Sequence, residues 1–149
     1  MANILQKGNI KSINVSEIKG IKKTPVESAV IFETGIKGDS HAGDWHRQVS
    51  FLADESADKM RKVMKEIGPG DFAENITTTG INYMQVKIGQ KIMIADNVTL
   101  EITQIGKECH QGCEIQTQVG YCIMPTEGIF AKVLKTGNIK IGDEVLIYE

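Results

Sequence analysis

Short runs of β-branched residues, each closed by glycine or asparagine, restrict the fold of this chain more than any other feature of its sequence. The 149 residues include 15 glycines and only 3 prolines. Such punctuation favours many short strands over long helices. We expect strands at residues 10–15, 28–32 and 48–52, the last of them short and buried. Residues 91–95 and 98–105 are expected to pair as a hairpin.

One sequence pattern occurs twice and points to a barrel. Residues 86–94 and 139–147 both begin with an apolar residue, lysine, isoleucine and glycine, and both continue with alternating apolar and polar positions. We interpret each as a glycine-containing turn that feeds a strand entering a barrel. The predicted fold is therefore mainly β, a β-barrel with a few short α-helices packed outside.

Two segments have the spacing of helices. Residues 53–67 place apolar side chains three and four positions apart, with Asp54 or Ser56 as the expected N-cap. A second, shorter helix is expected at residues 127–135 after Thr126, because the apolar residues 130 and 134 would share a face.

Composition excludes several classes of protein. Apolar residues make up 41% and charged residues 24%, and the formal net charge is -2, as in an ordinary soluble domain. We expect residues 1–149 to form a single domain, without nucleic-acid binding, because the basic surplus that phosphate contacts need is missing. The adjacent Lys22 and Lys23 are interpreted as part of a solvated turn. No apolar run approaches the roughly 20 residues of a membrane span, and no signal peptide is recognised, so we expect a cytoplasmic protein.

The segment 38–47 concentrates the residue types that carry chemistry. It holds two of the three histidines, the only tryptophan and one of the two arginines. Its two Asp-x-His pairs are candidate metal ligands. Two alternatives remain: a surface loop held by Asx-turns, or a contact with a substrate or anion. We favour His46 and Arg47 for function, because a guanidinium beside an imidazole suits an oxyanion. The residues in question are Asp39, His41, Asp44, Trp45, His46 and Arg47.

Three cysteines lie close together at positions 109, 113 and 122. Without an export signal we expect reduced thiols. Cys109 and Cys113 do not match a haem-attachment motif. They supply at most half of the ligands of a structural zinc site, in which Cys122 would be a third ligand. The alternative is that they are small apolar core residues. A free thiol has a pKa of about 8.5, so reactivity would require a bound metal or Arg47 nearby.

The segment 122–130 resembles a helix start, with Glu127 in its first turn. A glutamate there satisfies the helix dipole, so we expect capping rather than anion binding. Phosphate-binding glycine loops and the motifs of serine hydrolases and zinc proteases do not occur in the sequence.

Several separated motifs, in order, resemble those of the MOSC domain, the C-terminal module of molybdenum cofactor sulfurases. The resemblance runs from about Lys11 to the C-terminus and is strongest for short, stand-alone bacterial members. The motifs are G-D-S-H-A-G (38–43), W-H-R-Q-V-S (45–50), G-D-F-A-E-N-I (70–76), C-H-x-x-C (109–113), M-P-x-E-G-I-F-A (124–131) and I-G-D-E-V (141–145).

The resemblance implies a β-barrel that binds molybdenum cofactor or carries sulfur to it through a cysteine thiolate or persulfide. Some relatives use molybdenum to reduce N-hydroxylated substrates, and a cysteine ligates the metal there. Cys113 best matches that cysteine, followed by Cys109 and Cys122. The residues expected to line the cofactor pocket are Asp39, His41, Trp45, His46, Arg47 and Glu127.

The same resemblance implies partners among the proteins of molybdenum cofactor biosynthesis or sulfur donation, with an electron donor in the case of a reductase. The pyridoxal-phosphate-dependent domain of full sulfurases has no counterpart in the sequence, so pyridoxal phosphate is not expected to bind. Two alternatives stay open: a non-catalytic module for cofactor delivery or partner binding, and a zinc protein that uses His41, His46 and the cysteines.

Overall fold

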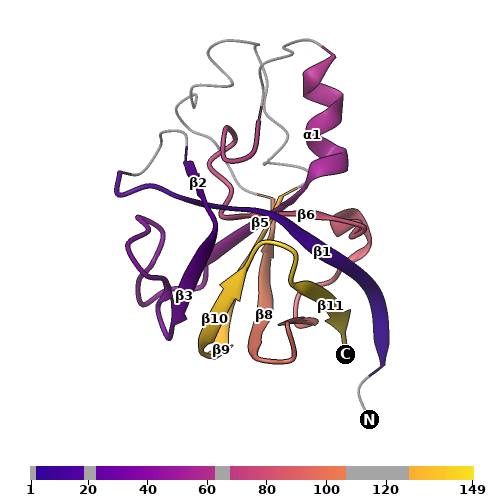
Figure 1. The fold of residues 1–149 in the computed structure, drawn as a ribbon. Helices are drawn as coiled ribbons and strands as arrows, with labels where there is room; N and C mark the ends of the chain where they lie inside the picture. Colours follow the sequence, from indigo (N-terminus) through magenta and orange to yellow (C-terminus); the bar gives the residue numbers. More distant parts are fainter. Residues whose placement is uncertain (1–2, 19–22, 63–67, 107–127) are drawn as a thin grey trace.

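Seven strands close into a barrel in this computed structural model (Figure 1). The strand order is β11-β7-β8-β9-β5-β6-β1, and β1 pairs back with β11. This confirms the prediction of a mainly β, barrel-like fold. The structure describes residues 3–18, 23–62, 68–106 and 128–149. The barrel strands are β1 (Ile4–Val15), β5 (Val49–Ala53), β6 (Ile76–Thr79), β7 (Lys91–Ile94), β8 (Val98–Ile105), β9 (Ile129–Lys135) and β11 (Glu144–Tyr148).

Strand β1 crosses the whole molecule and serves three neighbours in turn. Its first half pairs with β11, its middle with β6, and its last residues with β2 (Thr24–Val26). The register shifts between Ile4 and Gln6 and again between Ile10 and Ser12. Such bulges bend and twist a strand, which lets β1 curve around the barrel.

A smaller sheet of three strands lies beside the barrel, in the order β10-β3-β4. It consists of β10 (Gly137–Lys140), β3 (Ser28–Phe32) and β4 (Gly35–Ile36). Strand β3 has the predicted bounds. One face of the β3–β10 pair carries Ile31 and Ile139, which are buried and belong to the common core.

The two turns with the repeated pattern have the same geometry. In the first, Gln90 N–H donates to the Lys87 carbonyl (3.1 Å) and the Gln90 side chain accepts from Lys87 N–H (3.0 Å). In the second, Asp143 and Lys140 make the same two contacts at 3.2 and 2.9 Å. Each turn leads into a strand, and these strands, β7 and β11, pair with each other. The prediction of two strands fed by glycine turns is confirmed.

The predicted first helix is confirmed for its first half. Helix α1 (Asp54–Arg61) buries Ala57 and Met60 on the expected face. Residues 63–67 lie outside the described part of the chain. The expected cap was wrong: Ala53 is the N-cap and makes no side-chain hydrogen bond, because β5 runs directly into the helix. None of the described helices is long and apolar enough to cross a membrane.

The predicted second helix was wrong. Residues 129–135 form β9, which pairs on one side with β5 and on the other with β8. The sequence of this segment permits a helical face, but these pairings satisfy its backbone and bury Ile129, Phe130 and Ala131. Long-range pairing therefore overrode a local pattern.

Candidate functional site

The segment 38–47, here the 38–47 loop, is fixed at its start by the buried Asp39 carboxylate. One oxygen of this group accepts hydrogen bonds from the Lys23 ammonium (2.7 Å) and the Ser16 N–H (3.0 Å). The other accepts from the His41 N–H (3.0 Å), which is an Asx-turn. Burial by itself would raise the pKa of Asp39, but the hydrogen bonds from Lys23 and the neighbouring Asn75 hold the pKa below its ordinary value of 3.8. The carboxylate is therefore ionised and engaged within the protein.

Lys23 reaches Asp39 because its backbone lies tightly against Gly70. The Lys23 N–H donates to the Gly70 carbonyl at 2.8 Å. Gly70 has φ +87°, and a Cβ there would come within 2.3 Å of the Lys23 carbonyl oxygen. Only glycine accommodates both this backbone conformation and this approach. Lys23 is 4% exposed, so its interpretation as part of a solvated turn was wrong.

A buried polar network joins β1, β5 and β6 beneath these residues. The Asn75 side-chain oxygen accepts from the N–H of Ser50 (2.9 Å), and the Asn75 amide donates to the Asn14 carbonyl (3.2 Å). The Asn14 amide donates to the Thr77 hydroxyl (3.1 Å), which donates to Glu74 (2.7 Å). The hydrogen bonds of this network connect the three strands and favour one backbone arrangement.

The end of the 38–47 loop is an aromatic cluster around an arginine. The Trp45 indole N–H donates to the His41 carbonyl (2.7 Å). The Arg47 guanidinium carbon lies 4.6 Å from the centroid of the Trp45 ring and 5.6 Å from that of Phe130. These are cation–π distances. Among the described residues, the buried Nε of Arg47 has no hydrogen-bond partner.

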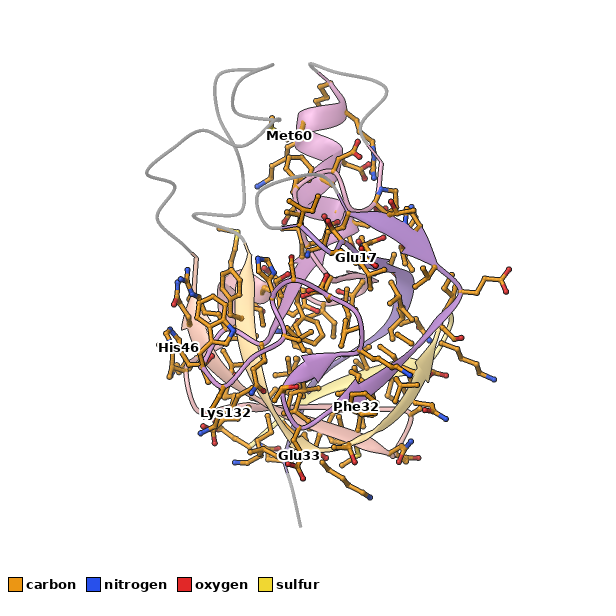
Figure 2. All side chains as sticks on the ribbon, turned by 90° about the vertical axis from the view of Figure 1, so that its left-hand side faces the viewer. Glu17, Phe32, Glu33, His46, Met60 and Lys132 are labelled. Atoms are coloured by element: carbon orange, nitrogen blue, oxygen red, sulfur yellow. The ribbon has the colours of Figure 1, made fainter. Side chains whose placement is uncertain are left out.

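His46 connects the 38–47 loop to the β8–β9 hairpin. Its Nε2 lies 2.9 Å from the Gln104 side-chain oxygen, and its carbonyl accepts a hydrogen bond from the Thr103 hydroxyl. Gln48, just after the loop, accepts from the Val133 N–H of β9 at 2.8 Å. Figure 2 shows His46 at the edge of the molecule, with Lys132 of β9 below it in the same view.

The β8–β9 hairpin ends beside this cluster. Ile105 pairs with Ile129, and the Gly106 N–H donates to the Gly128 carbonyl at 2.7 Å. The two ends of the segment 107–127 are therefore held next to each other. That segment contains Cys109, Cys113, Cys122 and Glu127, and these four predicted site residues lie outside the described part of the chain.

The structure brings together the predicted residues of the 38–47 loop, in two groups. Asp39 faces inward to Lys23, whereas His41 and Arg47 lie against Phe130 and Trp45 lies against Arg47. Asp44 is exposed. Within residues 3–18, 23–62, 68–106 and 128–149 there is no group of three or more histidine, cysteine, aspartate or glutamate residues suited to a metal.

Sequence reasoning missed the residues that support this loop. Lys23, Asn14 and Thr77 carry no local signal, because their roles depend on contacts between distant strands. Asn75 and Glu74 belong to the motif at 70–76, but its residues were not assigned a role. A buried asparagine and a buried glutamate can be recognised only once their burial is known.

The fold and this site define a class: a small closed β-barrel in which a His- and Arg-bearing loop lies at the end of a hairpin whose connection carries cysteines. A family model of the MOSC domain matches residues 38–146, and the chain belongs to the MOSC domain family. This family is associated with molybdenum cofactor.

Solved structures show the same fold. The YuaD protein from Bacillus subtilis superposes with a TM-score of 0.82 at 18% identity, covering 100% of this chain and 99% of that one. YiiM from Geobacillus stearothermophilus gives 0.73 at 19% identity, covering 95% and 75%. YiiM from Escherichia coli gives 0.70 at 14% identity, covering 96% and 70%. At such identities the likeness shows the fold alone. No curated protein sequence matches the chain.

Proposed function

We propose that the 38–47 loop is the anion-holding part of a molybdenum-cofactor site, and that Cys113 supplies the sulfur chemistry as a metal ligand or as a persulfide. The main supporting observation is the position of Arg47. Its guanidinium lies against Trp45 and Phe130, at the end of the hairpin whose connection carries the three cysteines.

The residues of the loop suit the phosphate and oxygen-rich parts of such a cofactor. The Arg47 guanidinium is planar, permanently charged and positioned by two aromatic rings, and its buried Nε has no described partner. His46, beside it, is exposed and offers an imidazole. Charge-assisted hydrogen bonds from such a pair are stronger than neutral ones and match the geometry of an oxyanion. Arg47 and His46 would hold the anionic part of the cofactor.

A cysteine thiolate suits the sulfur chemistry of the proposed site. When bound, the cofactor supplies a high-valent molybdenum centre, for which a soft thiolate is a good ligand. In sulfur transfer, the Cys113 thiolate attacks the outer sulfur of a persulfide on a donor protein. The donor S–S bond breaks, the donor leaves as a thiolate, and Cys113 holds the new persulfide. This exchange needs no oxidant or reductant.

The first test is the cofactor content of protein purified from a molybdate-replete host. Molybdenum, pterin and sulfane sulfur are measured per chain for wild type, Arg47→Gln and Lys132→Gln. Lys132 is a matched control, because it is a nearby cation on β9 that is paired with Glu101 (3.6 Å). Loss of a charged hydrogen-bond donor costs about 1.5–3 kcal/mol. The pterin content of Arg47→Gln should therefore be lower than that of wild type by a factor of roughly ten or more. Lys132→Gln should match wild type.

The second test compares the three cysteines. Cys113→Ser should lose molybdenum or sulfane sulfur, while Cys109→Ser and Cys122→Ser should retain both. Full loading of Cys113→Ser would remove that residue from the proposal. Wild type that lacks molybdenum and pterin but holds stoichiometric zinc after dialysis would overturn the proposal in favour of a zinc site. Turnover of an N-hydroxylated base by the loaded protein, with a chemical electron donor, separates a reductase from a delivery module.

A further inference from the structure

A second concave site lies between the small sheet and the barrel. It is a cavity of about 720 Å³, which is within the range of small-molecule sites. Its apolar lining comes from β1, β2, β3 and β10, and its polar rim from the neighbouring turns. The apolar residues are Val15, Val26, Ala29, Val30 and Ile139 on these strands, and Ala95 in the turn between β7 and β8.

This cavity is separate from the 38–47 aromatic cluster. None of His41, Trp45, His46 or Arg47 lines it. Figure 2 shows His46 at the left edge of the molecule and Phe32 near its middle, and Phe32 is on β3, the strand that contributes Ala29 and Val30 to the cavity. The proposed cofactor site therefore does not account for it.

The rim of the cavity carries two lysines that are not engaged with carboxylates. Lys37 has its Nζ 5.9 Å from the centroid of the Phe32 ring. Among the described residues, neither Lys37 nor Lys140 forms an ion pair. The one acidic residue of the lining, Asp143, accepts a hydrogen bond from the Lys140 N–H. The lining thus has an excess of positive charge.

The apolar wall is only partly covered. Val15, Val26 and Ala29 pack against the core but remain partly exposed, and Val30, on the other face of β3, is 37% exposed. A ligand that covered these side chains would gain about 25 cal/mol for each Å² of apolar surface removed from water. The side-chain amides of Asn97 and Asn138, also in the lining, offer both donors and acceptors.

From the apolar wall and the two rim lysines we infer that this cavity binds a small amphipathic carboxylate, with the apolar tail of a medium-chain fatty acid. The tail lies on Val15, Val26 and Ala29, and the carboxylate lies at the rim, where Lys37 and Lys140 supply positive charge. The concave shape and the volume of about 720 Å³ suit a small molecule. This inference does not depend on the proposed cofactor function.

The test is calorimetric titration of the full chain with decanoate and, in parallel, with the uncharged decanol. Decanoate should bind more tightly, and its affinity should fall with added salt. Lys140→Gln should weaken decanoate binding about two- to fivefold, as expected for a partly exposed ion pair. Lys87→Gln is the matched control, because Lys87 holds the equivalent place in the other repeated turn and does not line the cavity. It should bind like wild type.

A second variant tests the cavity itself. Ala29→Phe fills the apolar wall and should abolish binding of both ligands, with circular dichroism used to verify the fold. Equal affinity for decanoate and decanol, or equal effects of Lys140→Gln and Lys87→Gln, would overturn the assignment of the lysines. No binding to wild type, together with concentration-dependent dimerisation in sedimentation, would overturn the inference and identify the face as a protein contact. Pterin content is expected to be unchanged in Lys140→Gln.

Discussion

The carboxyl group of Glu74 is buried, and its surroundings shift its pKa. It is 1% exposed, and its carboxyl accepts a hydrogen bond from the Thr77 hydroxyl at 2.7 Å. Burial raises the pKa of Glu74 above its ordinary value of 4.5, more than the bonds from Thr77 and the backbone lower it. The folded protein therefore holds this proton more tightly than the unfolded chain does.

The pH dependence of stability follows from this shift. Between the ordinary pKa of 4.5 and the higher folded pKa, the native state binds more protons, so the free energy of unfolding falls as pH rises. Glu74→Gln removes the titration. Relative to wild type, the variant should gain stability as pH rises above 4.5 and should gain nothing below it. Urea denaturation from pH 4 to pH 8 measures this. Glu27→Gln, at an exposed position, should follow wild type; a Glu74→Gln profile parallel to wild type would contradict the prediction.

Sequence reasoning at this scale identified residue types but not their partners. The 38–47 loop was recognised from its histidines, tryptophan and arginine, and the structure does gather His41, Trp45 and Arg47. The pairing of Asp39 with Lys23 could not be predicted from the sequence. It requires the approach of two backbones at Gly70, which no pattern near Lys23 reveals.

At the scale of elements, the two repeated turns have the same structure. Gly89 has φ +96° and Gly142 has φ +93°, and a Cβ at either position would meet open space. The requirement for glycine there is therefore conformational rather than steric.

Replacing these glycines should cost similar amounts. A non-glycine residue in the left-handed region costs roughly 1–2 kcal/mol, so Gly89→Ala and Gly142→Ala should each lower the free energy of unfolding by about 1 kcal/mol. Gly68→Ala is the control, because Gly68 also faces open space but lies outside that region. It should be neutral in denaturant titrations. A large difference between Gly89→Ala and Gly142→Ala would show that the turns are not equivalent.

Elements with strong local signals were predictable, and those decided by distant pairing were not. The hairpin of β7 and β8 and the strand β3 follow from alternation and turn residues. Strand β9 could not be distinguished from a helix, because Phe130 and Leu134 fit either period. Its pairing with β5 and β8 decides the outcome.

At the scale of the whole molecule, the 38–47 loop is joined to the barrel at several points. Asp39 ties it to Lys23, His46 to Gln104, and Gln48 to β9. Trp45, the only tryptophan, lies in this loop and reports on it by fluorescence. We therefore expect loop and barrel to unfold together in wild type.

Asp39→Asn should cause the 38–47 loop to unfold before the barrel. Removing the carboxylate from a buried ion pair typically costs about 3–5 kcal/mol, because the remaining charge loses its compensation. The Trp45 fluorescence transition should then occur at lower denaturant than the far-UV circular dichroism transition of the barrel. Asp44→Asn, exposed in the same loop, should leave both transitions coincident. Coincident transitions in Asp39→Asn would show that the ion pair does not hold the loop.

The mainly β barrel itself was predictable from glycine punctuation and the repeated turns, whereas its closure was not. Closure depends on β1 and β11, at opposite ends of the chain, meeting in one register. Only the assembled curvature of the intervening strands brings them together.

That closure has a topological consequence. Asn3 and Glu149 exchange backbone hydrogen bonds at 2.9 and 3.1 Å, and Figure 1 shows the two ends of the chain close together. The strand pairings form a ring in which the position of the chain break is arbitrary. The polypeptide could be circularly permuted by joining its ends with a short linker and opening the tight reversal at Ala95 and Asp96. The permuted chain would keep all the strand pairings of the barrel.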